Sequence, residues 1–381
     1  MRKLCVLYML TIFLFILLFS SVFFIFRNTS TVISSKRFVH TINNKDNASN
    51  KSEIPEENIK LEREPLPVGI KPIPDEPRKV EIIMNFMGDC TLGTYCGEFT
   101  EGRFNETAER VQPEYFFEGV KHILDKGTFN ITNCEGVFTD NPLEEISKDY
   151  DPAFWFKSPA KNAGIFSANG IDAVGIANNH IGDYGQEGIN DTIKALEQYG
   201  VKWSDNNTPV LLEHEGIKIV LFCVETWNDV VVSGELCTQI QEYSETTDLQ
   251  IVFFHGGTEK IHTPDPHKIE YAHQFVDAGA DLVIGSHPHV LQPIEIYNDV
   301  TILYSLGNFV YGGNTHPENR TIVYTYTFSF ENGRLISQND EIHPCYIFTG
   351  EMNAFQPTII DDEYDRQAVL DFMNGLLESP L

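Results

Sequence analysis

The sequence has little positive charge, no cysteine pair at metal-binding spacing and no internal repeat. Its 27 Lys and Arg residues stand against 55 Asp and Glu residues, so the formal net charge is −28. A nucleic-acid binder needs a basic footprint to neutralise phosphates, and we therefore expect no nucleic-acid partner. No Cys-x-x-Cys segment occurs, which argues against a zinc–thiolate cluster.

The N-terminal segment also lacks charge, from Leu4 to Phe26. About 20 apolar residues span a bilayer core, so this run is long enough to cross one. We expect residues 1–27 to form an uncleaved signal-anchor transmembrane helix, with a cleaved signal peptide as the alternative. Residues 28–79 are polar and then proline-rich, which predicts an extended stalk. The prediction is a single-pass membrane protein whose main domain is extracellular or lumenal.

Glycosylation sequons and cysteines fit a compartment outside the cytosol. Eight sequons of the Asn-x-Ser/Thr type occur, among them those at Asn105 and Asn319, and they favour a secretory glycoprotein. Outside the anchor, six cysteines remain, an even number in a compartment where disulfides persist. Their pairing cannot be derived from spacing.

Short apolar segments alternate with helical patterns from residue 80 onward. The predicted strands are Val80–Met87, Thr128–Thr132, Ala173–Ile176, Ile217–Val224, Ile251–Phe254, Leu282–Ile284 and Thr301–Ser305. The predicted helices are Glu114–Lys126, Ala160–Asn169, Asn190–Tyr199 and Pro266–Ala278, each followed by glycine. Glycine is the usual helix stop because it adopts the left-handed conformation without a Cβ clash. This alternation predicts a layered α/β fold.

The C-terminal third has a different pattern. Asn298-Asp299 and Asn332-Gly333 each separate two β-type runs, which predicts hairpins and hence a sheet that is not wholly parallel. After Gly350 the pattern weakens, and residues 351–381 are predicted to be a C-terminal extension, either a short helix or a tail.

Metal-type side chains follow five of the predicted strands. They are Asp89, Glu135, Asn179 with His180, His255, and His287 with His289. Ligand sites in open α/β sheets form beyond the carboxyl ends of the strands. A lone Asp or Asn at such a position is most often a turn residue, and a lone His most often structural, so the prediction of a metal site depends on the coincidence. Mixed oxygen and imidazole ligands suit Mn, Fe or Zn better than calcium.

Three segments in this region carry a more specific pattern. They are Phe156–Gly185 with its Asn-Asn-His, His255–Gln292 with His-Gly-Gly-Thr-Glu and Gly-Ser-His-Pro-His, and Tyr304–Val310. In this order and spacing, from about Ile82 to Tyr311, the chain resembles the CapA family of poly-γ-glutamate capsule-biosynthesis proteins. The resemblance implies a calcineurin-like metallophosphoesterase fold for residues 80–350, a four-layer α-β-β-α sandwich, together with one N-terminal membrane tether.

The resemblance also implies two divalent metal ions and a role for each site residue. The implied ligands are Asp89 and His289 for the first ion, Glu135 bridging both, and Asn179, His255 and His287 for the second. His180 would be the proton donor or oxyanion partner, whereas Glu259 and Asn308 would orient ligands without binding metal. Two ions in such a site could polarise a phosphoryl or carbonyl oxygen and generate a hydroxide near neutral pH.

Three departures from the phosphoesterase pattern weaken the expected first metal site. Those enzymes usually have Asp-x-His after the first strand, and here the third position is Thr91. The bridging position is Glu135 rather than Asp, and Leu92-Gly93-Thr94 lacks the arginine that family members often carry. We therefore expect weaker binding of the first metal and reduced hydrolytic power.

Three functions are compatible with these residues. The leading hypothesis, which comes from the resemblance, is a part in synthesis or export of an anionic polymer, in a possible synthesis or export complex. The alternatives are a metal-dependent phosphoesterase acting on a small or lipid-linked substrate, and a non-catalytic module that grips carboxylates through a metal ion. No G-x-x-x-x-G-K-[ST] segment occurs, which argues against polymerisation by this chain itself.

Cys90 follows Asp89, and Cys134 precedes Glu135. If both carboxylates reach one metal ion, the two strands must lie close at their carboxyl ends, and a disulfide between the cysteines becomes geometrically possible. Two buried thiols are the alternative that we favour slightly, because adjacent residues on a strand point to opposite faces.

Overall fold

The computed structural model describes residues 77–95, 103–149, 153–226, 229–312 and 318–381. The predicted signal anchor and most of the predicted stalk lie outside these ranges. Within the described part, no helix is both long and apolar enough to cross a membrane. The anchor and the localisation stay predictions.

The first sheet is mixed and has seven strands in the order β16-β15-β14-β1-β3-β6-β7. Its strands are β1 (Lys79–Cys90), β3 (Phe129–Cys134), β6 (Ala173–Gly175), β7 (Lys202–Ser204), β14 (Arg320–Glu331), β15 (Arg334–Tyr346) and β16 (Thr358–Ile359). The strands β1, β3, β6 and β7 run parallel. The hairpin β14–β15 pairs antiparallel to β1 and turns at Asn332-Gly333, where both residues have positive φ.

The second sheet has six strands in the order β12-β13-β11-β10-β9-β8. Its strands are β8 (Val210–His214), β9 (Ile217–Glu225), β10 (Leu249–His255), β11 (Leu282–Ser286), β12 (Leu291–Tyr297) and β13 (Val300–Leu306). The central four are parallel, and the edge strands β8 and β12 are antiparallel. A small third sheet contains β2 (Thr94–Tyr95), β4 (Val137–Phe138) and β5 (Phe156–Ser158).

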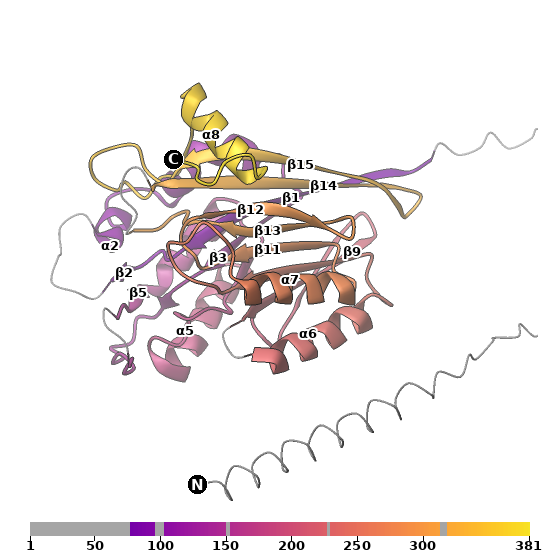
Figure 1. Cartoon of the computed structure of the whole chain (residues 1–381). Helices are drawn as coiled ribbons and strands as arrows, with labels where there is room; N and C mark the ends of the chain where they lie inside the picture. The colour runs from indigo at the N-terminus through magenta and orange to yellow at the C-terminus, as the bar shows by residue number, and fades with distance from the viewer. Residues whose placement is uncertain (1–76, 96–102, 150–152, 227–228, 313–317) are drawn as a thin grey trace, which may run out of the picture. The chain divides into compact units, whose positions relative to one another are not determined.

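Helices cover the outer faces of the two large sheets: α2 (Phe104–Ala108), η1 (Pro113–Val120), α3 (Lys121–Leu124), η2 (Ala160–Ala163), α4 (Gly164–Ala168), α5 (Gly185–Gln198), α6 (Asp229–Tyr243) and α7 (Pro266–Ala278). Helix α8 (Glu363–Met373) instead packs against β12 and β15 and contributes to the core between the sheets. Figure 1 shows α6 and α7 side by side along the sheet that contains β9 and β11.

Three apolar clusters hold these layers together. The inner faces of the two sheets meet in a core in which the rings of Phe86 and Phe253 pack edge to face, with centroids 6.3 Å apart. A second cluster joins the outer face of the first sheet to η1, α3, α4 and α5, and a third joins the second sheet to α6 and α7. Two packed sheets with helices on both outer faces agree with the predicted α-β-β-α sandwich.

The predicted helices occur, although their bounds differ. The pattern at Pro266–Ala278 matches α7, whereas the segments at residues 114–126 and 160–169 each begin as a 3₁₀ helix. Gly170, Gly200 and Gly279 have positive φ, as a helix stop requires, but Gly127 does not have it. Helix α6 was not predicted, because its Val-Val-Val run and Gly234 favour other structures.

Residues 351–381 pack against the rest of the domain. Strand β16 pairs with β15, and Phe372 and Met373 of α8 are buried in the core between the sheets. Two of the eight sequon asparagines are also buried: Asn130, in Asn130-Ile-Thr, is 5% exposed and Asn319 is 0% exposed. Because the Asn319 side chain donates to Phe348 O at 2.6 Å, a glycan at this position is incompatible with the fold.

Candidate metal centre

Asp89 is positioned by a close contact between the two sheets. Gly88 lies against the backbone of Gly307, where a Cβ atom would stand 1.9 Å from the carbonyl oxygen. Asp89 N donates to Gly307 O (3.0 Å), and Phe309 N donates to Asp89 O (2.8 Å). The register of β1 against β3 also shifts between Phe86 and Asp89, and such bulges are common beside functional sites. The Met-Gly-Asp segment therefore places one carboxylate at the junction of both sheets.

Glu135 and Asn179 follow the next two strands of the first sheet, β3 and β6. Glu135 N donates to Cys90 O at 2.9 Å, which holds the end of β3 against the end of β1. Cys90 and Cys134 are register partners in these strands, so the predicted proximity of the two cysteines is confirmed. Both are buried free thiols, the alternative that we favoured over a disulfide.

The histidines come from the second sheet. His255 ends β10, and His287 and His289 follow β11 in a turn with strained backbone: φ is 90° at His287 and 60° at His289. Non-glycine residues rarely adopt positive φ, and such strain gathers at functional sites. The Gly-Ser-His-Pro-His segment thereby turns two imidazoles toward the carboxylates.

Five of the six predicted ligands converge in three overlapping groups whose ligand atoms lie within 4.8 Å of one another. The groups are Asp89 with Glu135 and His289, Glu135 with His255 and His287, and Glu259 with His287 and His289. The sixth, Asn179, has its Oδ1 2.9 Å from His255 Nε2. Glu259, for which the resemblance implies only an orienting role, lies near enough to bind an ion directly.

Amide and hydroxyl groups hold these side chains in place. Asn133 Nδ2 donates to Asp89 Oδ1 (2.8 Å) and lies 3.1 Å from His255 Nδ1. Ser286 Oγ is 2.8 Å from the same imidazole nitrogen. Asn308 Oδ1 is 2.8 Å from His289 Nδ1, a contact that agrees with the predicted orienting role. Such partners fix ring orientation at metal sites.

Glu135 tests whether the cluster fits a metal ion. Its side chain is 0% exposed, and neither carboxylate oxygen has a hydrogen-bond partner among the described residues. His255 Nε2 lies 3.5 Å from Oε1, and His289 Nε2 lies 4.0 Å from it. A buried carboxylate without hydrogen bonds is costly unless a cation compensates it. The donor set, two carboxylates, an amide and three imidazoles, fits a divalent ion such as Mn, Fe or Zn.

The electrostatics of the ion-free cluster support this fit. Burial raises the pKa of Glu135 well above its usual value, and the charge of Asp89 adds to the shift. Burial lowers the pKa of His255 to about 3. At His289 burial opposes protonation, but the nearby Glu135 and Asp89 outweigh it and raise its pKa to about 9. The cluster thus retains protons that a divalent cation would displace, since metal binding releases protons from its ligands.

His180 lies beside this cluster with partners of its own. Its Nδ1 is 2.8 Å from Asp183 Oδ2, and Asp183 Oδ1 pairs with Lys148 Nζ at 2.5 Å. The Phe156 ring packs edge to face against the imidazole at 4.7 Å. Burial lowers the pKa of His180 against the opposing effect of Asp183, which favours the neutral ring at pH 7. With Nδ1 bound to Asp183, Nε2 is left to exchange a proton with a ligand.

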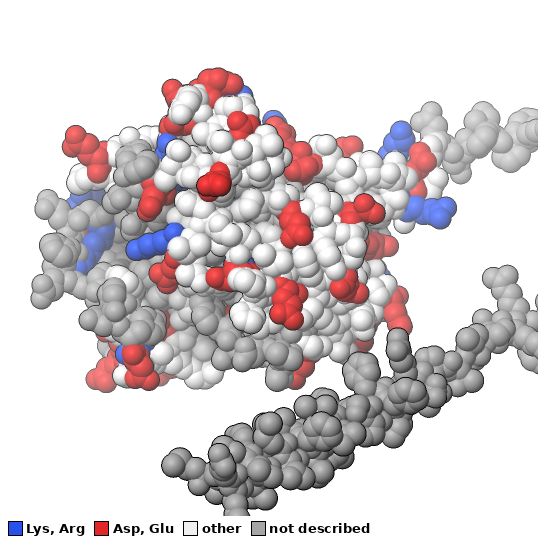
Figure 2. Space-filling view, viewed as in Figure 1, with Lys and Arg blue, Asp and Glu red and all other residues white. Residues whose placement is uncertain are grey.

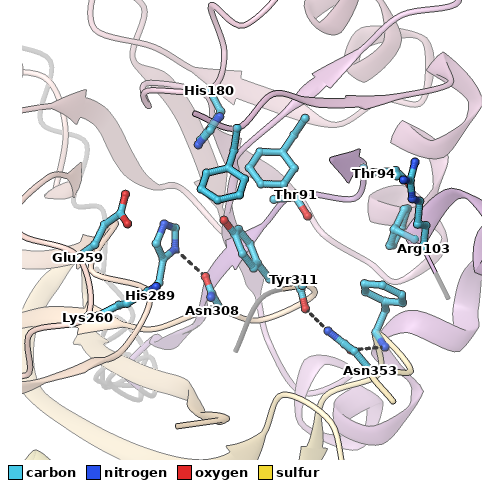
Figure 3. A pocket seen from close by; sticks show the side chains of 16 residues that line it. Thr91, Thr94, Arg103, His180, Glu259, Lys260, His289, Asn308, Tyr311 and Asn353 are labelled. Carbon is cyan, nitrogen blue, oxygen red and sulfur yellow. Dashed lines mark hydrogen bonds between the residues drawn. The ribbon is translucent and has the colours of Figure 1, made fainter. Parts of the chain in front are cut away.

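A cavity of about 430 Å³ opens beside the cluster. Figure 3 shows His180 and His289 at this cavity, with Lys260 and Arg103 on opposite sides of it. Aromatic side chains line much of the remaining wall: Phe104, Phe154, Phe156, Tyr311 and Phe355. The visible surface in Figure 2 is mostly acidic or uncharged, and its few Lys and Arg side chains lie mainly toward the two ends of the view. The cavity wall thus carries two cationic side chains, Lys260 and Arg103, together with the carboxylate of Glu259.

Asn133, Asp183, Lys148 and Ser286, which support the candidate ligands and His180, were not predicted, and neither were Lys260 and Arg103 of the cavity wall. Asp183 had a usable signal, because it follows His180 by three residues. Ser286 had one as well, directly before His287. Asn133 lies inside β3, and Lys148 lies in a segment without regular structure, so neither stood out by position.

The fold and the site together define an α/β sandwich protein with a carboxylate–imidazole centre at the carboxyl ends of its parallel strands. Residues 83–312 match the family described as bacterial capsule synthesis protein PGA_cap. The chain belongs to this family.

Named relatives agree with this assignment. The capsule biosynthesis protein CapA of Bacillus anthracis is 26% identical over 330 residues, which cover 78% of this chain and 75% of the relative. The PGA biosynthesis protein CapA of Bacillus subtilis is 26% identical over 281 residues, 68% of this chain and 71% of the relative. A probable polyglutamine synthesis accessory protein of Mycobacterium tuberculosis is 29% identical over 166 residues, 35% and 44% of the two chains.

Two solved structures match the chain with TM-scores below 0.5. A hypothetical protein from Thermus thermophilus has a TM-score of 0.43 and 15% identity, covering 69% of this chain and 99% of that one. The NAD nucleotidase of Haemophilus influenzae has a TM-score of 0.41 and 11% identity, covering 78% of this chain and 63% of that one. We draw no functional conclusion from either.

Proposed function

We propose that this chain acts in the synthesis or export of poly-γ-glutamate, using a divalent metal centre at the carboxyl ends of β1, β3, β6, β10 and β11. The observation that carries the proposal is the family match over residues 83–312, which includes all six candidate ligands. The Bacillus relatives named for capsule and PGA biosynthesis support the same process.

The cavity suits part of an acidic polymer. Lys260 and Arg103 can each attract a carboxylate from opposite sides, and the aromatic wall can pack against methylene groups between them. Lys260 has φ of 59°, and its N–H donates to Pro288 O at 2.8 Å, so the backbone holds this residue beside the His287–His289 turn. A polymer segment bound here would lie against the candidate metal ligands.

A bound divalent ion would supply a Lewis acid for a phosphoryl or carbonyl oxygen. The chain's own residues would then orient the ligand and move protons. His180 Nε2 is the group available for proton exchange, and Asp183 and Lys148 fix the ring that carries it. Phe156 and Tyr311, with ring centroids 5.7 Å apart, would exclude water from one side.

Titration calorimetry with a short γ-linked glutamate oligomer tests the proposal on the full chain in detergent. We expect binding that chelator treatment weakens, and that Lys260→Met weakens about tenfold. Lys194→Met is the matched control, since its side chain is 74% exposed on α5, a helix that contributes no residue to the cavity wall. Equal binding by wild type, chelator-treated protein and Lys260→Met would contradict the proposal.

Metal-dependent hydrolysis is a second candidate, and the His180–Asp183 pair favours it. Assays with phosphomonoester and phosphodiester probes on metal-loaded protein distinguish it from carboxylate binding alone. Turnover that His180→Gln abolishes while metal stays bound would identify a hydrolase. Oligomer binding without turnover would identify the non-catalytic module.

We also propose the membrane anchor in residues 1–27 and an extracellular or lumenal main domain, both supported by the apolar run at Leu4–Phe26. Protease added to sealed cells should digest the domain. Full protection of the domain in intact cells would contradict this topology.

A further inference from the structure

Lys268 is a fully buried lysine beside the proposed metal centre. It lies in the first turn of α7 and is 2% exposed. Its Nζ donates to Gly256 O at 2.8 Å and to Ser286 O at 3.2 Å. Burying an ammonium is costly, so lysine is almost never fully buried without partners.

The two carbonyl oxygens that Lys268 contacts lie beside the histidines, where β10 and β11 end. Gly256 directly follows His255, and Ser286 directly precedes His287. Gly256 N also donates to Ser286 O at 3.2 Å, so the two strand ends already touch at this point. The ammonium thus joins the two backbone segments from which both imidazoles project.

Further contacts around Lys268 hold the loop after β10 against the N-terminus of α7. Asp265, directly before α7, accepts from Thr258 N at 2.6 Å and from Thr258 Oγ1 at 2.9 Å. The Phe254 ring lies 5.2 Å from Lys268 Nζ, within the range of a cation–π contact. Gly257 has φ of 107°, and a Cβ atom there would stand 3.0 Å from Lys268 Cδ.

An apolar side chain of the same length would avoid the cost of burying an amine, but it would leave Gly256 O without this donor. The contacts of Lys268 therefore stabilise the point where the two histidine-bearing segments meet, and the same contacts fix how the two segments lie against each other.

We propose that Lys268 is a positioning residue that sets the spacing of His255 and His287 for metal binding. The inference depends on the proposed metal centre, and it names a residue outside the predicted site. Outer partners of metal ligands typically contribute 10–100-fold in metal affinity. Lys268 acts one step further out, on the backbone of the ligands.

Chelator competition on the full chain in detergent, with Mn²⁺ or Zn²⁺ as the metal, measures the effect. Lys268→Met keeps the length and removes the donor, and we expect it to lower the affinity about tenfold or more. Lys268→Gln keeps a donor and should restore part of the affinity. Thermal unfolding of each metal-free variant shows whether the fold is retained, and hydrogen exchange at residues 256–259 should be faster in Lys268→Met.

The possible outcomes separate this inference from the proposed function. If wild type binds no metal, both fail. If wild type binds metal and Lys268→Met binds it equally well, only the role of Lys268 is overturned. If Lys268→Met does not fold, Lys268→Gln decides, because its side chain is one bond shorter and cannot hold both carbonyl oxygens at the wild-type distances. Affinity equal to wild type with unchanged exchange at residues 256–259 overturns the inference, and a loss of affinity in the folded variant supports it.

Discussion

Carboxylates lie at both ends of the parallel strands: Asp172 and Asp281 are half-buried at the amino ends, and Glu135 is fully buried at the carboxyl ends. At the amino ends, Asp172 accepts from Asn130 N at 2.8 Å, and Asp281 accepts from Gln250 N at 2.7 Å. The first joins strands of one sheet, and the second joins strands of the other. At the carboxyl ends, neither oxygen of Glu135 has a hydrogen-bond partner in the described ranges.

A carboxylate that accepts hydrogen bonds from a neighbouring strand has a structural role, whereas a buried one without such bonds is suited to bind a cation. Asp172 and Asp281 stand in the same local context, two residues after the glycines that stop α4 and α7, and each bonds a neighbouring strand through its backbone. Glu135 faces His255 and His289 instead. All three are carboxylates beside strand ends, so it is their burial and their hydrogen-bond partners that distinguish them.

The largest expected effect is on metal binding at the carboxyl ends. His287→Ala should lower metal affinity by more than about 100-fold, beyond the effect of residues that only orient ligands. Asp281→Asn, at the other end of β11, should leave the affinity unchanged. Elemental analysis after dialysis, with chelator competition, measures both. If His287→Ala retained metal, or if wild type prepared with excess metal contained none, the carboxyl ends of the strands would not differ from the amino ends in metal binding.

Glu135→Gln should produce two opposite effects. It removes a ligand, so metal affinity should fall by at least about 100-fold. It also removes a buried carboxyl group whose pKa burial raises, so the metal-free variant should be more stable than metal-free wild type at pH 7 by about 1–3 kcal/mol. Thermal unfolding with and without metal measures both effects. A metal-free variant less stable than wild type would mean that Glu135 is already compensated.

The alternation of strands and helices was predictable from the sequence because it depends on local pattern. The apolar spacing of Pro266–Ala278 and the glycine after it predicted α7. Asn298-Asp299 predicted the β12–β13 hairpin, in which both turn residues have positive φ. The candidate ligands were also predictable, since each follows a strand end. Their convergence from two different sheets was implied by the family resemblance and not by local pattern, because it depends on contacts such as Gly88 against Gly307.

Residues whose role depends on tertiary contacts could not be predicted from the local sequence. Lys268 has the position of an ordinary helix residue, and only its contacts with Gly256 and Ser286 show its surroundings. Asn319 looked like a glycosylation position by its three-residue pattern, but it is buried. Local sequence carries no signal for burial of this kind, since burial is set by segments distant along the chain.

A smaller effect is expected on the free energy of unfolding, whose pH dependence should reflect the carboxylates at the amino ends of the parallel strands. Burial raises the pKa of Asp281 from 3.8 to about 6. The folded state therefore favours the protonated group, and the stability that this gives at low pH is lost as pH rises through about 6. Asp281→Asn keeps an oxygen for Gln250 N and cannot ionise. We expect it to match wild type at pH 3.5 and to exceed it by about 2 kcal/mol at pH 7.

Denaturant unfolding at several pH values measures this dependence. Asp172→Asn is the matched comparison in the first sheet, because burial raises the pKa of Asp172 as well, and the effect should have the same sign. A loss of stability at pH 7 in Asp281→Asn would show that the ionised group strengthens its bond to Gln250 N more than burial weakens it.

The smallest effect is expected from the two thiols that neighbour the carboxyl-end carboxylates. Cys90 and Cys134 belong to the apolar cluster under the helices of the first sheet, whereas Asp89 and Glu135 face the histidines. Burial raises the pKa of Cys90 to about 12, so the thiol stays protonated at pH 8 and reacts slowly. Each Cys→Ala variant should lose about 1 kcal/mol of stability and keep its metal affinity within about twofold, since only packing is disturbed. Alkylation of the folded domain at pH 8 should spare both thiols, and denaturant should expose both. Rapid alkylation without denaturant, or a folded protein lighter by two hydrogens after mild oxidation, would show that these strand ends open and that the carboxylates beside them are less fixed than their contacts indicate.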